Sequence, residues 1–368
     1  MADKNIKYTQ HFTNHAYQMI ANLMKDLPDN IDVQEPFFGK GDLVIPFMSK
    51  IRSIDAYDID KKLINVHNEI LVKNQDTLIN PPNQSKKYII TNPPYLSKNH
   101  AGQRFNYIFA NSKYDDFYKI AIHNIKNALG GILVVPLNFL TDQKSSNIRN
   151  YFFSNYQIKT LNVFNFKAFD ETSYQTCAFS FLKKGNKTSK DLIKINIFSS
   201  YTHIEKQIST TIFKENNWKL FDSLVSKYSS ELIVNRITNI NKNNDEKLML
   251  PIVFNLIDKS QNSFKNLDGE IKAVYDKPHI SKSSERILLS IQLNQDYYDK
   301  YNDFLSNQKN IDHLITEFNR ITNALRTDTG NIIFSSFRDF NRKRISFNYV
   351  YQIISYLIIN NYQKDNYN

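Results

Sequence analysis

The stretch "YIITNPPYLS" (88–97) joins an apolar, β-branched run directly to Asn-Pro-Pro-Tyr. Consecutive prolines cannot continue a strand ladder, because proline lacks a backbone N–H and fixes φ. A strand that begins at Tyr88 therefore has to end near Asn92. A simple turn needs neither a second proline nor an aromatic ring, so segment 92–95 predicts a rigid turn with a function.

The chain around this turn alternates short β-branched runs with stretches of helical spacing, which is typical of a parallel α/β sheet. Further strands are expected at 31–37, 53–59, 131–140, 157–166 and 176–184. A helix is expected over 115–129, with Gly130-Gly131 as its stop signal. The polar string "GNKTSKD" (185–191) is the best linker candidate.

The second half has a different residue pattern, with aromatic and polar residues mixed together and few clear strands. Helical spacing appears at 302–326 and an apolar helix is expected near 348–360. The fold of this half does not follow from its sequence. A length of 368 residues suits two domains.

Bulk composition excludes several classes of protein. No stretch approaches the roughly 18 apolar residues of a membrane span, and the N-terminus carries no apolar signal core. The single cysteine, Cys177, excludes an internal disulfide framework and a clustered-thiol zinc site. These features lead us to expect a cytoplasmic protein without a membrane partner.

The net charge of +11 and the pI near 9.3 favour a phosphate-bearing partner. The excess of lysine and arginine is spread over both halves of the chain. A lysine-, asparagine- and isoleucine-rich composition can also produce such a charge by itself. Charge alone therefore leaves nucleic acid binding open.

A glycine turn, "EPFFGKGDLV" (35–44), follows the first expected strand and is expected to lead into a helix. Glycines two apart let a ligand approach the backbone closely. Val44 breaks the dinucleotide-binding fingerprint, and no Gly-Lys-Ser/Thr follows. The pattern Phe37-x-Gly39-x-Gly41 is weak by itself.

Acidic residues end the next two strands. Asp58 follows Gly41 at the distance where a carboxylate accepts hydrogen bonds from ribose hydroxyls, whereas Asp60 suits a helix cap. Asp76 could accept a bond from an adenine amino group or occupy a solvated turn. Together the strand ends favour a nucleoside ligand such as S-adenosylmethionine.

The order of Phe-x-Gly-x-Gly, acidic strand end and Asn-Pro-Pro-Tyr resembles the gamma-class DNA adenine-N6 methyltransferases of restriction-modification systems. "YTQHFT" (8–13), "LGGILVVPLNFL" (129–140) and "KAFDETSYQTCAFSFLKKG" (167–185) resemble further segments of that family, although Asn14 replaces its usual proline. The resemblance implies an α/β fold with a Rossmann-like class I methyltransferase sheet over 1–186. It implies a target-recognition, DNA-binding domain over 187–368, either mixed α/β or mostly α.

The resemblance also implies roles for individual residues. Catalysis falls to Asn92, Pro93, Pro94 and Tyr95, and the base is stacked between Tyr95 and Phe169. The Asn92 side-chain oxygen and the Pro93 carbonyl would accept the adenine amino hydrogens, with no metal required. S-adenosylmethionine would be bound by Tyr8, His11, Thr13, Glu35, Pro36, Phe37, Gly39, Gly41, Asp58, Ile59, Asp76, Thr77 and Asn92.

Basic residues in two segments are candidates for DNA contacts. Lys98 and Arg104 follow the catalytic turn, although a solvated loop explains them equally well. In "SSFRDFNRKRISF" (335–347) the cations alternate with phenylalanines, and the competing interpretation is a basic helix that packs on the core. The candidates in this segment are Arg338, Arg342, Lys343 and Arg344.

The expected activity is methylation of adenine N6 on a base flipped out of duplex DNA. The expected partners are double-stranded DNA and a cognate restriction endonuclease that shares the site without a stable complex, and the chain is expected to be a monomer. Cytosine-N4 DNA methylation and methylation of protein glutamine or RNA use the same turn geometry and stay open. A DNA-binding partner with a degenerate cofactor site is the alternative that is not an enzyme.

Overall fold

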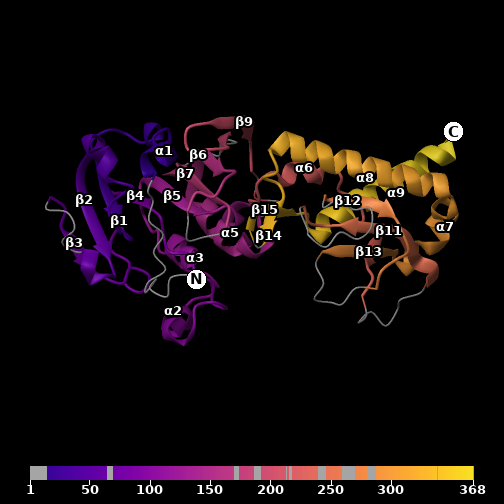
Figure 1. The fold of residues 1–368 in the computed structure, drawn as a ribbon, viewed down its shortest axis with the longest axis horizontal. Coiled ribbons are helices and arrows are strands. Elements are labelled where there is room, and N and C mark those ends of the chain that lie inside the picture. Colours follow the sequence, from indigo (N-terminus) through magenta and orange to yellow (C-terminus); the bar gives the residue numbers. More distant parts are fainter. Residues whose placement is uncertain are drawn as a thin grey trace. The chain divides into compact units, whose positions relative to one another are not determined.

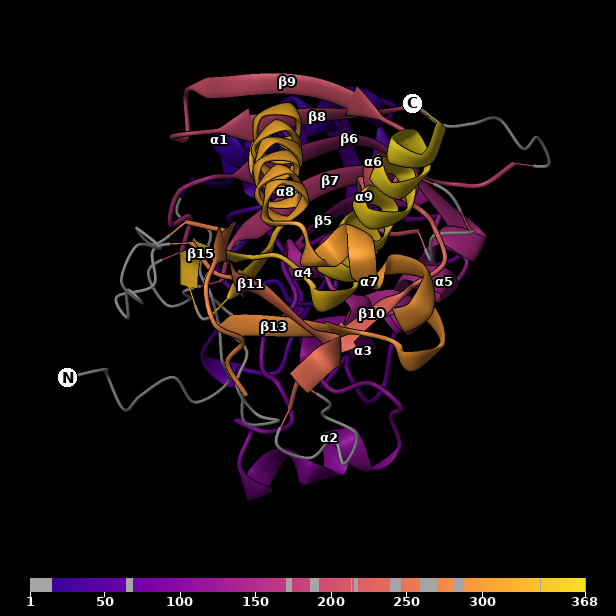
Figure 2. The same ribbon diagram turned by 90° about the vertical axis from the view of Figure 1, so that its right-hand side faces the viewer.

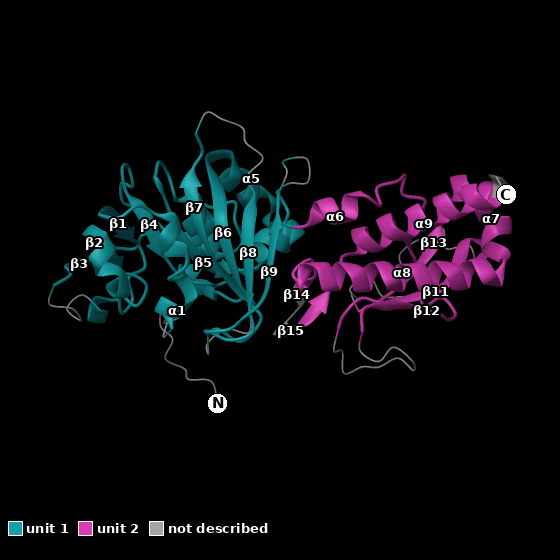
Figure 3. Ribbon diagram, turned by 90° about the horizontal axis from the view of Figure 1, so that it is seen from above, with its two compact units in different colours: residues 1–220 teal, residues 221–368 magenta. Residues whose placement is uncertain are grey.

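A computed structural model shows the protein as two compact units, Met1–Leu220 and Phe221–Asn368 (Figure 3). The structure describes residues 15–63, 69–169, 174–185, 192–212, 214, 218–238, 246–258, 270–280, 287–337 and 339–367. The expected domain boundary at 186/187 lies inside the first unit. Two strands that follow it, β8 (Ile193–Phe198) and β9 (Ile204–Thr210), extend the first sheet.

Unit 1 is built on a nine-stranded sheet in the order β3-β2-β1-β4-β5-β7-β6-β8-β9 (Figure 1). The strands from β3 to β5 pair in parallel, and β7 runs antiparallel between β5 and β6. This arrangement confirms the expected Rossmann-like α/β sheet. The bounds are β1 Ile31–Glu35, β2 Ile51–Asp58, β3 Val72–Asn74, β4 Tyr88–Thr91, β5 Gly130–Pro136, β6 Tyr156–Phe164 and β7 Thr176–Lys183.

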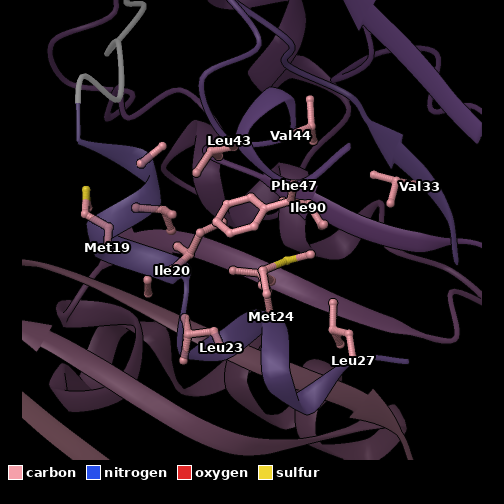
Figure 4. Close-up of a cluster of buried hydrophobic side chains, with 14 of the residues drawn as sticks. Met19, Ile20, Leu23, Met24, Leu27, Val33, Leu43, Val44, Phe47 and Ile90 are labelled. Carbon is pink, nitrogen blue, oxygen red and sulfur yellow. The ribbon is translucent and has the colours of Figure 1, made fainter. Parts of the chain in front are cut away.

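The central strands of this sheet are buried on both faces, which explains why β4, β5 and β7 are mostly apolar. On one face, α1 (Ala16–Ile20) and the 3-10 turn Leu23–Asp26 pack over Ile90, and the Phe47 ring lies among them (Figure 4). On the other face, Phe139 and Phe152 pack against Phe179. Each of these three phenylalanines is 0% exposed.

The helices of unit 1 are shorter than expected. Helix α3 spans only Phe117–His123, and Gly130-Gly131 begin β5 instead of ending the helix. A Cβ on Gly131 would lie 1.8 Å from the Ile89 carbonyl oxygen, so glycine is required for β5 to approach β4. The other helices are α2 Asn106–Ala110, α4 Asn138–Thr141 and α5 Ser146–Asn155.

Two local predictions in unit 1 were wrong. The strand expected over 131–140 ends at Pro136, because α4 begins two residues later. The glycine turn leads into a 3-10 segment, Ile45–Lys50, and not into an α-helix. Further 3-10 turns in this unit span Lys61–Leu63, Gln103–Phe105 and Gln143–Ser145.

Unit 2 is mixed α/β, one of the two forms expected for it (Figure 2). Its antiparallel sheet has the order β10-β13-β11-β12, and β14 with β15 forms a hairpin. The strands are β10 Val234–Arg236, β11 Met249–Asn255, β12 Lys272–Tyr275, β13 Leu288–Leu293, β14 Ser335–Phe337 and β15 Asp339–Arg344. The helices are α6 Asp222–Ser226, α7 Tyr298–Ser306, α8 Gln308–Thr329 and α9 Phe347–Tyr367, with 3-10 turns at Glu246–Leu248 and Gln295–Tyr297.

The two helical predictions in this unit are confirmed, with one break. The stretch 302–326 is divided between α7 and α8 at Asn307, whose side chain caps α8 by accepting from the Lys309 N–H at 3.0 Å. Among the described residues no helix is long and apolar enough to cross a membrane.

Candidate active site

The candidate site lies where the carboxyl ends of β1, β2 and β4 meet. These strands are parallel neighbours, with Glu35 opposite Ala56 and Gln34 opposite Ile89 (Figure 1). The segments that follow them therefore emerge at the same edge of the sheet, the usual ligand edge of an open α/β fold. The glycine turn, the Asp58 strand end and the Asn-Pro-Pro-Tyr turn are brought together as expected.

The Asp58 carboxylate fastens the glycine turn to β2. Its Oδ2 accepts from the Gly39 N–H at 2.8 Å, and its Oδ1 accepts from the Asp60 N–H at 2.8 Å. Gly41 has a φ of +77°, a backbone conformation that residues with a side chain rarely adopt. A carboxylate can accept about four hydrogen bonds, so these two amides still permit contacts to ribose hydroxyls.

Asp60 and Ile59 differ in their surroundings. Asp60 accepts from the Lys62 N–H at 3.0 Å, which agrees with its expected role as a local cap. Ile59 is partly exposed beside Asp58, and its carbonyl accepts from the Asn74 side chain at 3.0 Å. The expected contact of Ile59 with a cofactor stays a prediction.

Glu35 is a buried carboxyl at the end of β1. Its Oε1 accepts from the Phe37 N–H at 3.0 Å and from the Thr91 hydroxyl, which ties β1 to β4. Burial raises the pKa of Glu35 to about 8, and the nearby Asp58 carboxylate adds to the rise. Glu35 is therefore largely protonated at neutral pH.

This raised pKa predicts a pH dependence of stability. Between about pH 4.5 and pH 8 the folded chain keeps a proton on Glu35 that the unfolded chain has lost. The free energy of unfolding is therefore highest below pH 4.5 and falls as the pH rises to 8. Relative to wild type, Glu35→Gln should gain about 1.4 kcal/mol of unfolding free energy per pH unit across this interval. Denaturant unfolding at several pH values measures the difference.

The matched control for this experiment is Glu205→Gln, because Glu205 is exposed on β9. It shows what removal of an exposed carboxylate does to the free energy of unfolding at each pH. A Glu35→Gln profile that matches the Glu205→Gln profile would contradict an elevated Glu35 pKa.

A small pocket, with room for about one water molecule, lies at this edge. Four of the expected site residues, Pro36, Phe37, Thr77 and Pro93, belong to its lining, and most of the other lining side chains are apolar. The Thr77 hydroxyl donates to the Pro36 carbonyl at 2.8 Å, which joins two walls of the pocket.

Asp76 lies beside this pocket, and both of its carboxylate oxygens accept a hydrogen bond. Its Oδ1 accepts from the Leu78 N–H at 3.1 Å, and its Oδ2 accepts from the Tyr107 hydroxyl at 3.3 Å. Tyr107, on α2, is 51% exposed. The segment after the catalytic turn therefore reaches the residue expected to recognise adenine, a contact that the sequence does not reveal.

The Asn-Pro-Pro-Tyr turn is held to β5 by its tyrosine. The Tyr95 hydroxyl lies 2.5 Å from Asn92 Oδ1 and 2.9 Å from the Val134 carbonyl oxygen, and its single proton can serve one of them at a time. The Tyr95 ring is 7% exposed and meets Tyr118 edge-on at 6.3 Å. Asn92 is thus paired with Tyr95 before any amine reaches it.

Phe169, the expected second stacking residue, is 3% exposed and belongs to the hydrophobic cluster beneath the sheet. Tyr174 lies five residues further along, just before β7, and is 45% exposed. Burial and the Asp116 carboxylate raise its pKa. Sequence analysis missed Tyr174, although its position directly before the last expected strand was visible.

The two cations that follow the turn are at the surface. Lys98 and Arg104 are both exposed, and the Arg104 guanidinium lies 4.6 Å from the centre of the Phe105 ring. Their expected contacts with phosphates stay predictions.

In unit 2 the basic segment forms a hairpin, not the helix considered as an alternative. Lys343 is 4% exposed, and burial lowers its pKa to about 7 beside Asp258. Its side chain is buried within the unit, so Lys343 is not placed to contact DNA as the sequence had led us to expect. Arg342 is partly exposed, and Arg338 lies outside the described residues.

Arg344 and a cation from a distant strand both contact the ring of Phe347. Its guanidinium lies 5.1 Å from the centre of Phe347, and that of Arg236, on β10, lies 4.9 Å from the same centre. Arg236 was not predicted, because only folding brings it to the hairpin.

Asp258 also resembles part of a nuclease metal site, together with Glu270 and Lys272. In the structure its carboxylate pairs with both guanidinium nitrogens of Arg326, at 2.5 and 2.9 Å, and accepts from the Ile271 N–H. No three His, Cys, Asp or Glu side chains gather around a metal-sized site in the part of the chain that the structure describes.

The remaining predictions from the sequence concern three residues near the N-terminus and the single cysteine. Tyr8, His11 and Thr13 lie outside the described residues. Cys177 is 0% exposed, and burial raises its thiol pKa, as suits a core residue.

A mostly parallel α/β sheet that gathers a glycine turn, an acidic strand end and Asn-Pro-Pro-Tyr at one edge defines a Rossmann-like methyltransferase domain. The chain belongs to the N-6 DNA Methylase family, whose model matches residues 56–246, just over half of the 368 residues. The match contains the Asn-Pro-Pro-Tyr turn and most of the sheet, and it confirms the family suggested by the sequence. No curated protein sequence matches the chain.

Solved structures with a similar fold share little sequence. One, described as a modification subunit of a type I restriction enzyme from Vibrio vulnificus YJ016, is 14% identical, with a TM-score of 0.44 over 62% of this chain and 55% of that one. A class I S-adenosylmethionine-dependent methyltransferase from Listeria monocytogenes is 14% identical, with 0.39 over 51% and 64%. A type I methyltransferase subunit from Streptococcus thermophilus is 17% identical, with 0.37 over 51% and 47%. The chain thus spans less than two thirds of each.

Proposed function

We propose that the protein is a sequence-specific DNA methyltransferase that transfers a methyl group to N6 of a flipped-out adenine in duplex DNA. The observation that carries the proposal is the position of Asn92, at the carboxyl end of β4, beside the glycine turn that Asp58 fastens. Membership of the N-6 DNA Methylase family supports the choice of base and atom. We also propose that the protein acts in the cytoplasm, within a restriction-modification system.

The residues at the strand ends fit S-adenosylmethionine. We propose that the adenine ring of the cofactor lies against Pro36, Phe37 and Thr77 at the sheet edge, with the Asp58 carboxylate as an acceptor for ribose hydroxyls. When bound, S-adenosylmethionine supplies a methyl group on a positively charged sulfur, which becomes a neutral thioether on transfer. We therefore assign Glu35, Asp58, Asp76 and the glycine turn to cofactor binding.

Asn92 and Pro93 act on the target amine. An exocyclic adenine amine is a poor nucleophile, because its lone pair is delocalised into the ring. Acceptance of its two hydrogens by the Asn92 side-chain oxygen and the Pro93 carbonyl would direct that lone pair and stabilise positive charge on nitrogen. An amide oxygen has two lone pairs, so Asn92 Oδ1 can accept from the amine and from the Tyr95 hydroxyl together, and the Val134 carbonyl is a second acceptor within reach of that hydroxyl.

We propose that Tyr95 and Tyr174 contact the flipped base, with Phe169 beneath them in the core. Tyr174→Ala should lower kcat/KM on DNA about 10- to 100-fold, because stacking on an aromatic ring is worth about 1–3 kcal/mol per base. Tyr174→Phe keeps the ring and should stay within about threefold of wild type. Steady-state kinetics, with 2-aminopurine at the target position to report flipping, measure both.

The same experiment tests Phe169. Phe169→Ala should lower the melting temperature, because truncation of a buried phenylalanine costs about 3–5 kcal/mol. If Phe169→Ala abolished flipping at an unchanged melting temperature while Tyr174→Ala behaved as wild type, the stacking role would return to Phe169.

Sequence recognition is assigned to the second half of the chain, with Arg342 and Arg344 of the hairpin as candidate DNA contacts and Arg236 as a further one. Lys98 and Arg104 are proposed to contact phosphates near the flipped base. The proposed partners are double-stranded DNA and a cognate endonuclease that acts on the same site, and the proposed state is a monomer without a metal requirement.

The test of function is incubation of the purified chain with labelled S-adenosylmethionine and unmodified DNA, followed by nucleoside analysis. N6-methyladenine is the expected product. Methylated cytosine would overturn the choice of base, and label in RNA or in protein glutamine would overturn the choice of substrate. Single-molecule sequencing of DNA from cells that express the protein would then report the target sequence.

A further inference from the structure

Asp116 is a partly buried carboxyl that the proposed chemistry leaves without a role. It lies 21 residues after Tyr95 in the chain, immediately before α3. Burial raises its pKa to about 7, although Lys119 opposes the rise. Burial raises the pKa values of Tyr95, Tyr118 and Tyr174, and the Asp116 charge adds to each rise. The carboxyl is therefore coupled electrostatically to three tyrosines, of which Tyr95 and Tyr174 are the ones proposed to contact the base.

The contacts of Asp116 join the catalytic turn to α3. Its Oδ1 accepts from the N–H of Leu96, the residue after Tyr95, at 3.2 Å, and from the N–H of Tyr118 at 3.4 Å. A backbone hydrogen bond also joins the turn to α3: the Phe117 N–H donates to the Leu96 carbonyl at 3.2 Å. Ser97 and Asp116 form an isolated antiparallel bridge.

The turn is thus held at two places that differ in kind. At the hydroxyl of Tyr95, the contact is with Asn92 Oδ1, the atom that the amine would also use. At the main chain of Leu96, the contact with Asp116 involves no atom that the amine needs. The second contact can remain whether or not the first one is kept.

We propose that Asp116 is a positioning residue that anchors the backbone of the Asn-Pro-Pro-Tyr turn through Leu96, so that Asn92 and Tyr95 keep their places when the target base enters. The proposal rests on the proposed function for its effect on catalysis. The anchor itself is a property of the fold and can be tested without methyl transfer.

Two variants separate the acceptor from the charge. Asp116→Ala removes the acceptor for both N–H groups, whereas Asp116→Asn keeps an oxygen that can accept from both and removes the charge. The matched control is Asn307→Ala, which also deletes a helix cap, in unit 2, where Asn307 accepts from the Lys309 N–H.

Amide hydrogen exchange followed by mass spectrometry tests the anchor. In Asp116→Ala, exchange of peptides that cover 93–98 and 117–119 should be about tenfold faster, while Asp116→Asn and Asn307→Ala leave it as in wild type. Unchanged exchange in Asp116→Ala, or equally fast exchange in both Asp116 variants, would overturn the anchor.

Kinetics test the consequence. Asp116→Ala should lower kcat about 10- to 100-fold, because a small misplacement of reacting groups costs that much. KM for DNA and the cofactor dissociation constant should stay within about threefold, and Asp116→Asn should restore kcat. A wild-type kcat in Asp116→Ala would refute the positioning role. So would a loss of cofactor binding together with a melting temperature far below that of Asn307→Ala, since Asp116 would then be only a structural cap.

The two proposals can fail separately. If the wild-type chain transfers no methyl group to DNA, the proposed function fails, and hydrogen exchange alone decides whether Asp116 anchors the turn.

Discussion

Replacement of Asn92 with alanine is expected to lower kcat for methyl transfer about 1,000-fold, equivalent to about 4 kcal/mol of transition-state stabilisation. The side-chain oxygen of Asn92 is the acceptor that the turn places at the carboxyl end of β4. Alanine removes this acceptor but leaves Pro93, Pro94 and the backbone of the turn. It also removes one of the two acceptors within reach of the Tyr95 hydroxyl, which can still bind the Val134 carbonyl.

Incorporation of labelled methyl groups into DNA measures this effect, and a gel-shift experiment measures DNA binding, which should stay within about threefold of wild type. Asn150→Ala is the matched control, because Asn150 lies on α5, away from the turn. Methyl transfer by Asn92→Ala at more than about a tenth of the wild-type rate would rule out the proposed acceptor.

The second large effect is expected at Asp58. Asp58→Ala should weaken binding of S-adenosylmethionine about 100-fold, or about 2.7 kcal/mol. The variant loses a candidate acceptor for ribose hydroxyls, and the N–H groups of Gly39 and Asp60 lose the carboxylate that holds the glycine turn. Isothermal titration calorimetry with the cofactor measures the change directly.

The control for Asp58 is Asp32→Ala. Asp32 is on the neighbouring strand β1 and forms an ion pair with the exposed Arg52, which holds the pKa of Asp32 down at about 2. Loss of an exposed ion pair costs little, so cofactor affinity should stay within about twofold of wild type. Tight cofactor binding by Asp58→Ala would remove Asp58 from the cofactor site.

Local sequence was a good guide to the half of the chain that forms the parallel sheet. Strands buried on both faces, such as β4 and β5, are mostly apolar, and Pro93 shows where β4 has to stop. The same reasoning failed for Gly130-Gly131, which open β5, because the close approach of Ile89 to Gly131 comes from strand pairing. A glycine pair has the same appearance in sequence whether it ends a helix or admits a neighbouring strand.

The candidate site was predicted unevenly for a related reason. Residues at or directly after the end of a strand, such as Asp58 and Asn92, are at the sheet edge whenever the strand is correctly identified. Exposure depends on packing, so Phe169 is in the core and the nearby Tyr174 is at the surface. Lys343 and Arg344 are adjacent in sequence, yet only one is buried, because successive residues of a strand point to opposite faces.

The sequence by itself determined the family, the parallel sheet and the turn at its edge, because these depend on local patterns of apolar residues, glycine and proline. Tertiary structure alone decided which side chains meet there. It placed the Asp116 carboxylate on the Leu96 amide, the Tyr95 hydroxyl between Asn92 and Val134, and Tyr107 on Asp76. Such contacts join residues from separate elements, and no local pattern encodes the distance between them.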